Sequence, residues 1–129
     1  MNKNISGDSL IFTLDGAGDN TCSSVTYVND KGEWNKLAET PLKSSLGYIY
    51  SATTKFLGMK VLEHEYKVMG LAAYSKENYS NKLYKKLFEE VIWLSKGNNL
   101  VFDSKLNTSS FYDYLAKHAV GERFDNLAG

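Results

Sequence analysis

Three short runs with strand character open this chain, and a proline follows the last of them. Residues 10–14 are mostly apolar, residues 21–30 alternate loosely, and residues 34–40 come after the turn-forming segment 29–32 (Asn-Asp-Lys-Gly). Strand-like runs separated by such turn residues are typical of antiparallel hairpins. The sequence therefore predicts a three-stranded antiparallel sheet that ends at Pro41.

Helical spacing begins directly after that proline. The apolar and small residues that recur at helical intervals are Leu46, Ile49, Tyr50, Thr53 and Leu57. Ser44 or Ser45 is suited to cap the start of this helix, and Gly58 is suited to end it. The β-β-β-α order that results predicts an α+β fold, with the sheet first and the helices after it.

The second half of the chain has helical patterns and one further strand. A short helix is expected over residues 69–74, and the longest amphipathic pattern covers residues 79–96. A short strand is expected over residues 98–103 and a further helix over residues 110–118, ended by Gly121.

Charge and cysteine content exclude several classes of function. The 129 residues include 15 basic and 15 acidic side chains, so no overall field favours nucleic acid or an acidic membrane surface. The single cysteine, Cys22, cannot form an internal disulfide, which fits a reducing compartment. No apolar run approaches the roughly 20 residues that span a bilayer, and no signal-peptide core follows the N-terminus. We expect one cytoplasmic domain over residues 1–129, with no nucleic-acid or membrane partner.

Residues 15–19 (Asp-Gly-Ala-Gly-Asp) follow the first predicted strand, as phosphate-binding loops do. Two glycines let a backbone approach an anion closely, and successive N–H groups can hold it. The pattern alone is more typical of a tight turn. Two carboxylates beside a phosphate also require a divalent cation between them.

Residues 65–74 contain a glycine inside an apolar run. Gly70 costs about 1 kcal/mol relative to alanine in a helix, so we expect close packing there, against a neighbouring backbone or a ligand. Lys67 is either a surface lysine paired with Glu63 or Glu65 or a phosphate partner. The two histidines form no His-x-x-x-His pair, so no metal ligand is assigned in this chain.

Four segments resemble, in the same order, the motifs of one enzyme family. Residues 65–74 resemble the signature EYKVMGLAPYG of the nodulation-type and antibiotic-tailoring O-carbamoyltransferases. Residues 12–19 resemble that family's TLDGVGE segment, residues 41–52 its PHSLGLLYSA segment, and residues 122–128 its ERFDAIAA segment. The resemblance runs over nearly the whole chain.

The resemblance implies a ribonuclease H-like fold of the actin and sugar-kinase superfamily, present as a half-domain, and a chain that is a fragment of the family's ATP-dependent domain. The full-length enzyme is then expected to use ATP and a divalent metal (iron or magnesium), with none bound to the fragment. Carbamate released from carbamoyl phosphate is coupled to ATP, giving carbamoyl adenylate and pyrophosphate, and the carbamoyl group passes to a hydroxyl acceptor. The remaining domains of the same protein are the implied partners.

The same resemblance assigns roles to individual residues. Asp15 is the implied catalytic residue, and it lies near the nucleotide phosphates or the metal together with Gly16 and Gly18. Three residues of the later motif are implied to form the wall of the nucleotide pocket: Lys67, Met69 and Gly70.

Two other classes of function remain open at this point. One is a phosphotransferase or ATPase of the same superfamily, which rests on fold analogy alone. The other is an interaction domain that keeps the fold without the chemistry.

Overall fold

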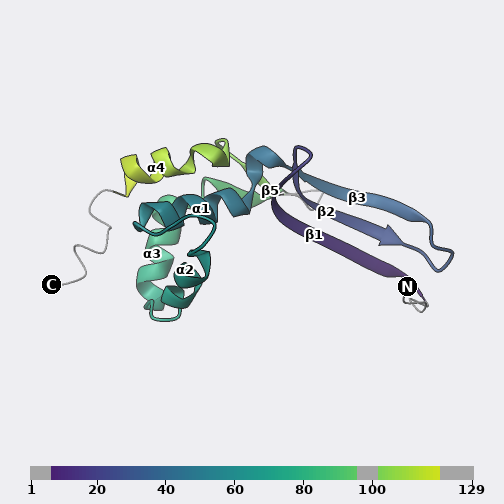
Figure 1. The fold of residues 1–129 in the computed structure, drawn as a ribbon, viewed down its shortest axis with the longest axis horizontal. Helices are drawn as coiled ribbons and strands as arrows, with labels where there is room; N and C mark the ends of the chain where they lie inside the picture. Colours follow the sequence, from purple (N-terminus) through teal and green to yellow (C-terminus); the bar gives the residue numbers. More distant parts are fainter. Residues whose placement is uncertain (1–6, 96–101, 120–129) are drawn as a thin grey trace.

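The computed structural model describes residues 7–95 and 102–119. In chain order the elements are β1 (Ser9–Gly18), β2 (Thr21–Val28), β3 (Trp34–Pro41), η1 (Leu42–Ser44), α1 (Leu46–Phe56), α2 (Glu65–Ala72), α3 (Glu77–Leu87), β4 (Ile92–Leu94), β5 (Phe102–Ser104), η2 (Thr108–Ser110) and α4 (Phe111–His118). Figure 1 shows the sheet of β1, β2 and β3 extending away from the helices, which gather at the other end of the molecule. The α+β prediction is confirmed. None of the helices in these two ranges is long and apolar enough to cross a membrane.

The first sheet has the order β1-β2-β3, with both pairs antiparallel. The predicted end of the first strand at Leu14 is wrong, because β1 continues to Gly18. Leu14 lies opposite Ser23 and Gly18 opposite Thr21, so residues 15–17 bulge opposite the single residue between those partners. The reversal itself needs only Asp19 and Asn20, whose φ angles are 43° and 66°. Aspartate and asparagine tolerate this left-handed conformation better than other side chains do.

Helix α1 begins and ends as the sequence predicts. The Ser45 side chain caps it by accepting a hydrogen bond from the Tyr48 backbone N–H, at 3.3 Å. After the last turn Gly58 adopts a φ of 75°, which a residue with a side chain rarely adopts. These two signals fix where the helix starts and stops.

The predicted lengths of the next two helices are wrong. Helix α2 starts at Glu65 rather than at Met69, and α3 ends at Leu87, although helical spacing continues through Val91. Residues after α3 form turns that hydrogen-bond to the Phe88 carbonyl, and β4 then pairs with β5. The run Val-Ile-Trp favours a strand, and this pairing overrides the helical spacing.

The other predictions for this half are confirmed or fall outside the described ranges. Helix α4 matches the predicted 110–118 helix. The predicted strand over residues 98–103 overlaps β5 at 102 and 103, and its residues 98–101 lie outside the described residues, as do Gly121 and the segment 122–128.

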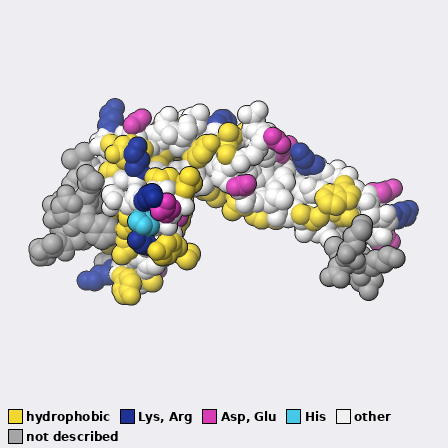
Figure 2. Space-filling view, in the orientation of Figure 1, with side chains coloured by type: hydrophobic (Ala, Val, Ile, Leu, Met, Phe, Trp, Pro, Cys, Tyr) yellow, Lys and Arg dark blue, Asp and Glu magenta, His cyan; other side chains and the backbone are white. Residues whose placement is uncertain are grey.

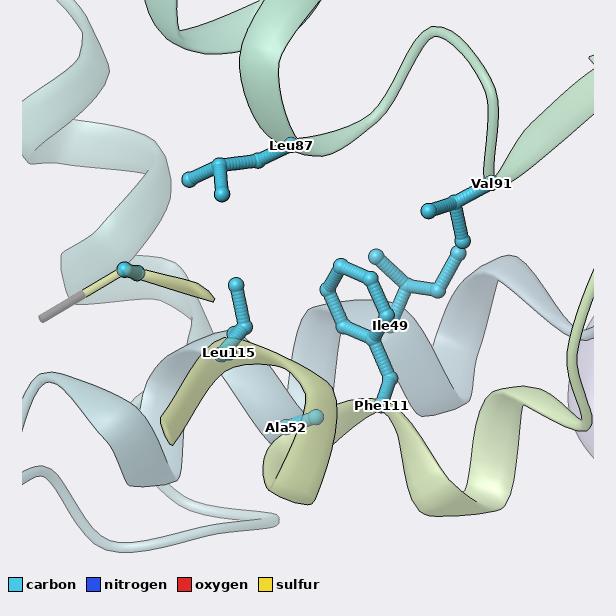
Figure 3. Close-up of a cluster of buried hydrophobic side chains, with 7 residues drawn as sticks. Ile49, Ala52, Leu87, Val91, Phe111 and Leu115 are labelled. Atoms are coloured by element: carbon cyan, nitrogen blue, oxygen red, sulfur yellow. The ribbon is translucent and has the colours of Figure 1, made fainter. Parts of the chain in front are cut away.

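The hydrophobic core lies among the helices rather than against the sheet. Figure 3 shows Ile49 and Ala52 of α1 facing Phe111 and Leu115 of α4, with Leu87 nearby. Val91 and Ala119 complete the buried cluster. Phe111 is fully buried, and its ring lies 5.5 Å from the ring of Phe88, centroid to centroid. Burial of such a side chain stabilises the fold by about 1.5–3 kcal/mol, so the α1–α4 contact holds the helical end together.

Candidate functional site

The bulged end of β1 lies directly against the first turn of α1. The Ser45 hydroxyl donates a hydrogen bond to the Gly16 carbonyl oxygen, at 2.7 Å. A Cβ atom placed on Gly47 would lie only 2.7 Å from the Gly16 Cα. The two backbones therefore meet at a distance that only glycine at position 47 allows, and Ser45 both caps the helix and anchors the bulge.

The bulge presents an exposed carboxylate. The Gly16 N–H donates to Asp15 Oδ1 at 2.6 Å, so that N–H is already engaged and is not free for an anion. A Cβ placed on Gly16 would have no heavy atom within 4 Å, so the backbone is open to solvent on that side. Asp15, Gly16 and Gly18 thus lie together on one accessible segment. Gly18 ends β1 next to the Asp19–Asn20 turn.

This segment does not by itself make a metal centre. Over residues 7–95 and 102–119, no three His, Cys, Asp or Glu side chains converge on one point. Magnesium and calcium each take six or more ligands, most of them oxygens. A divalent ion at Asp15 would therefore need the rest of its ligands from water, from a substrate or from another part of the protein.

Helix α2 carries the second group of predicted site residues, and it buries no side chain. Met69 is exposed. A Cβ on Gly70 would meet nothing within 4 Å, so the predicted close packing of Gly70 against a neighbouring backbone is wrong for the described residues. Gly70 instead lies on an open helix surface.

Lys67 is free of the ion pairs considered from the sequence. Its Nζ lies 5.9 Å from the centroid of the Tyr66 ring, a weak contact with its neighbour. Glu63 pairs with Lys60 instead. Within the described part of the chain no carboxylate lies at ion-pair distance from Lys67, so its charge is available to a ligand.

Glu65 is the residue of this segment that sequence reasoning missed. Its Oε1 accepts hydrogen bonds from the Leu62 backbone N–H at 2.8 Å and from the Ser51 hydroxyl at 3.3 Å. The Leu62 N–H lowers the pKa of the Glu65 carboxyl below its ordinary value. Glu65 thus ties α2 and its preceding loop to α1. An acidic residue in the first turn of a helix was the available signal.

The two groups of site residues contact different parts of α1. Asp15 and its neighbours lie at the start of α1, whereas α2 is tied to α1 through Ser51, about two turns farther along. Figure 2 shows that the molecule is bent, with a hollow on its lower side between the helical end and the sheet. A ligand that reached both groups would have to extend along α1.

An open pocket of about 410 Å³ lies at the turn between β1 and β2. Its lining comes from that turn, the end of β3, η1, α1, and η2 with its N-cap residue, and consists of Asn20, Pro41, Leu42, Lys43, Tyr48, Asn107 and Ser109. The Lys43 ammonium lies 3.6 Å from the Asp103 carboxylate, so the positive charge here is partly compensated. The sequence pattern pointed to none of these residues as a site, because they come from four separate segments.

A match to a known protein family covers nearly all of the residues described above. The family model described as "Carbamoyltransferase N-terminus" matches residues 5–120. The chain therefore belongs to the carbamoyltransferase N-terminal family.

Three longer proteins are similar to parts of this chain. Nodulation protein NolNO of Sinorhizobium fredii is 41% identical over 81 residues, which are 63% of this chain and 12% of NolNO. Nodulation protein NolO of Bradyrhizobium diazoefficiens is 36% identical over 81 residues, 63% of this chain and 14% of NolO. Uncharacterized protein MJ1051 of Methanocaldococcus jannaschii is 27% identical over 142 aligned residues, which cover 94% of this chain. The chain spans 12–27% of the length of these relatives.

Proposed function

We propose that this chain is the first part of the ATP-dependent domain of an O-carbamoyltransferase. The observation that carries the proposal is the family match over residues 5–120. The antiparallel sheet followed by helices is compatible with half of a ribonuclease H-like domain of the actin and sugar-kinase superfamily. In the longer enzyme, carbamate derived from carbamoyl phosphate would react with ATP to give carbamoyl adenylate and pyrophosphate, and the carbamoyl group would pass to a hydroxyl acceptor with release of AMP.

In this proposal the β1 bulge approaches the nucleotide phosphates. Gly16 is open on the side where a side chain would stand, which lets a phosphate or its metal come close to the backbone. The Asp15 carboxylate would contribute a ligand to the cation that accompanies the phosphates, and Gly18 leaves the strand end accessible. A bound divalent ion supplies charge neutralisation at the phosphates.

Helix α2 supplies the second contact. Lys67 has no carboxylate partner among the described residues, so its ammonium is free to meet a phosphate as a point charge. Met69 and Gly70 form the surface beside it. The bulge contacts the first turn of α1, whereas α2 contacts the middle of that helix. The nucleotide would therefore extend along α1, and residues of the longer protein would complete its pocket.

The proposal is tested by the products that the full-length protein releases from ATP and carbamoyl phosphate. Carbamoyl adenylation yields pyrophosphate and AMP, whereas a phosphotransferase or ATPase yields ADP. The isolated 129-residue chain should release no pyrophosphate above background. ADP as the product would favour the phosphotransferase, and a folded full-length protein without turnover would favour an interaction domain.

Asp15→Ala in the full-length protein should lower carbamoyl transfer by about two orders of magnitude, because a lost metal or phosphate contact is worth several kcal/mol. Asp30→Ala is the matched control, since Asp30 is also an exposed aspartate and lies in the β2–β3 turn. A thermal melt checks that both variants fold. Equal activity in the two variants would show that Asp15 has only a structural role in the turn.

A further inference from the structure

The bulge of β1 is only partly fixed by strand pairing. The register of β1 and β2 shifts after Leu14, and residues 15–17 then lie opposite Cys22 alone. A bulge leaves its extra residues out of the regular ladder, and the direction of their side chains depends on what else holds them. The Asp15 carboxylate belongs to this part of the strand, so its orientation requires a contact other than β2.

That contact is a buried hydroxyl group of α1's N-cap. The Ser45 side chain is fully buried, and its Oγ donates to the Gly16 carbonyl oxygen at 2.7 Å. The same Oγ accepts from the Tyr48 backbone N–H at 3.3 Å. A serine hydroxyl has one proton to donate and two lone pairs, so this side chain serves the bulge and the first turn of the helix together.

A short chain of hydrogen bonds joins Ser45 to the Asp15 carboxylate. Gly16 accepts from Ser45 at its carbonyl, and its N–H donates to Asp15 Oδ1 at 2.6 Å. Gly16 is also pressed close to the helix, because a Cβ on Gly47 would lie 2.7 Å from its Cα. A shift of Gly16 away from α1 would therefore turn the carboxylate as well.

The preceding serine contacts a different part of the molecule. Ser44 and Ser45 are both 0% exposed. The Ser44 hydroxyl lies 2.9 Å from the Ser104 hydroxyl of β5, whereas the Ser45 hydroxyl contacts the β1 bulge. Two adjacent side chains of the same type thus stabilise the same region, and they differ in whether they reach Gly16.

We infer that Ser45 is a positioning residue of the proposed site, which holds the Gly16 carbonyl so that the Asp15 carboxylate is aimed at the cation of the nucleotide phosphates. The inference rests on the proposed function, because that function places Asp15 at the phosphates. Ser45 itself touches no substrate and acts through the bulge. Without its hydroxyl the Gly16 carbonyl loses its donor, and a misplacement of about 1 Å in an active site can lower a rate about 100-fold.

A double-mutant cycle in the full-length protein tests this role, with the rate of ATP consumption as the readout. Ser45→Ala should lower the rate about 10- to 100-fold when Asp15 is present. In an Asp15→Ala background it should lower the remaining rate less than about 3-fold, because its effect passes through Asp15. An effect of the same size in both backgrounds would overturn the inference, since a merely structural loss does not depend on Asp15.

Ser44→Ala is the matched control, because it removes an equally buried hydroxyl one residue earlier. Both alanine variants leave a buried polar group without its partner, so both should lower the melting temperature. Only Ser45→Ala should lower the rate more than about 3-fold. Equal rates in the two variants would also overturn the inference.

Gly47→Ala keeps the test decisive if Ser45→Ala does not fold. Its Cβ pushes on Gly16 while the Ser45 hydroxyl stays in place, so it should lower the rate with the same dependence on Asp15. A Gly47→Ala effect that is independent of Asp15 would then overturn the inference.

The outcome separates this inference from the proposed function, because ATP consumption is followed whichever product forms. ADP in place of pyrophosphate would overturn carbamoyl adenylation and leave the role of Ser45 intact. Pyrophosphate release that Ser45→Ala does not lower would overturn the role of Ser45 alone. A full-length protein that consumes no ATP would overturn both.

Discussion

Gly47→Ala is expected to destabilise this protein, although alanine is the better helix former. The added Cβ would lie 2.7 Å from the Gly16 Cα and 3.5 Å from the Gly16 nitrogen, so a backbone has to move. Forcing an extra carbon into a packed contact costs about 1–3 kcal/mol. Replacing a helical glycine by alanine returns at most about 1 kcal/mol. Because the atoms that the Cβ meets are backbone, the cost lies in the upper part of that range, about 2–3 kcal/mol, and the net loss in the free energy of unfolding is about 1–2 kcal/mol.

Gly70→Ala is the matched control, because it makes the same chemical change in another helix of the same chain. Its Cβ would meet nothing within 4 Å, so only the gain in helix propensity of up to about 1 kcal/mol remains. With a urea m-value of about 2 kcal/mol/M, Gly47→Ala should lower the urea midpoint by about 0.5–1 M, and Gly70→Ala should raise it by up to about 0.5 M. A Gly47→Ala midpoint at or above that of the wild type would refute the close contact between α1 and the bulge.

Two further predictions concern α2. The Glu65 carboxylate is stabilised by the Leu62 N–H, so its contribution is complete above its ordinary pKa of 4.5 and is lost as the pH falls through the lower pKa of the folded state. Between pH 7 and pH 3 the urea midpoint of the wild type should therefore fall more than that of Glu65→Gln, and an equal fall in both would contradict the assignment. In the full-length protein Lys67→Ala should weaken ATP binding about 10- to 100-fold, the value of a hydrogen bond to a charged group, with stability changed by less than about 0.5 kcal/mol. Lys60→Ala, which removes a lysine already paired with Glu63, is the control, and nucleotide titration that finds the same ATP affinity in both variants would make the α2 motif purely structural.

Local chemistry made the sheet and α1 predictable. Residues 29–32 are of the types that favour a chain reversal, and Gly32 adopts a positive φ there. Ser45 accepts a hydrogen bond from a backbone N–H at the start of α1, and Gly58 adopts the positive φ that follows its end. The end of α3 was not predictable in this way. Apolar residues at helical spacing continue to Val91, and what ends the helix is the pairing of β4 with β5, a contact with residues about ten positions later.

The glycines of the candidate site show what could not be predicted from the sequence alone. Gly70 was expected to pack closely and lies on an open surface, whereas Gly47 was not singled out and makes the tight contact. A glycine in a helical pattern indicates only that a side chain is missing. Whether a neighbour fills the space depends on the approach of another segment, in this protein the β1 bulge from about 30 residues earlier. The glycine pattern of residues 15–19 alone favoured a tight turn, so Asp15, Gly16 and Gly18 were predicted as site residues through the resemblance.

Helix α1 contacts both groups of candidate site residues through hydrogen bonds and packs against the core. Its first turn holds the Gly16 carbonyl through Ser45, and Ser51 in its middle donates to Glu65 at the start of α2. Its inner face contributes Ile49 and Ala52 to the core with α4. A change that rotates or shifts α1 must therefore move the bulge, α2 and the core together. The spacing between Asp15 and Lys67 is therefore set by α1 itself, through Ser45 and Ser51, and the buried contact of α1 with α4 holds that helix in place.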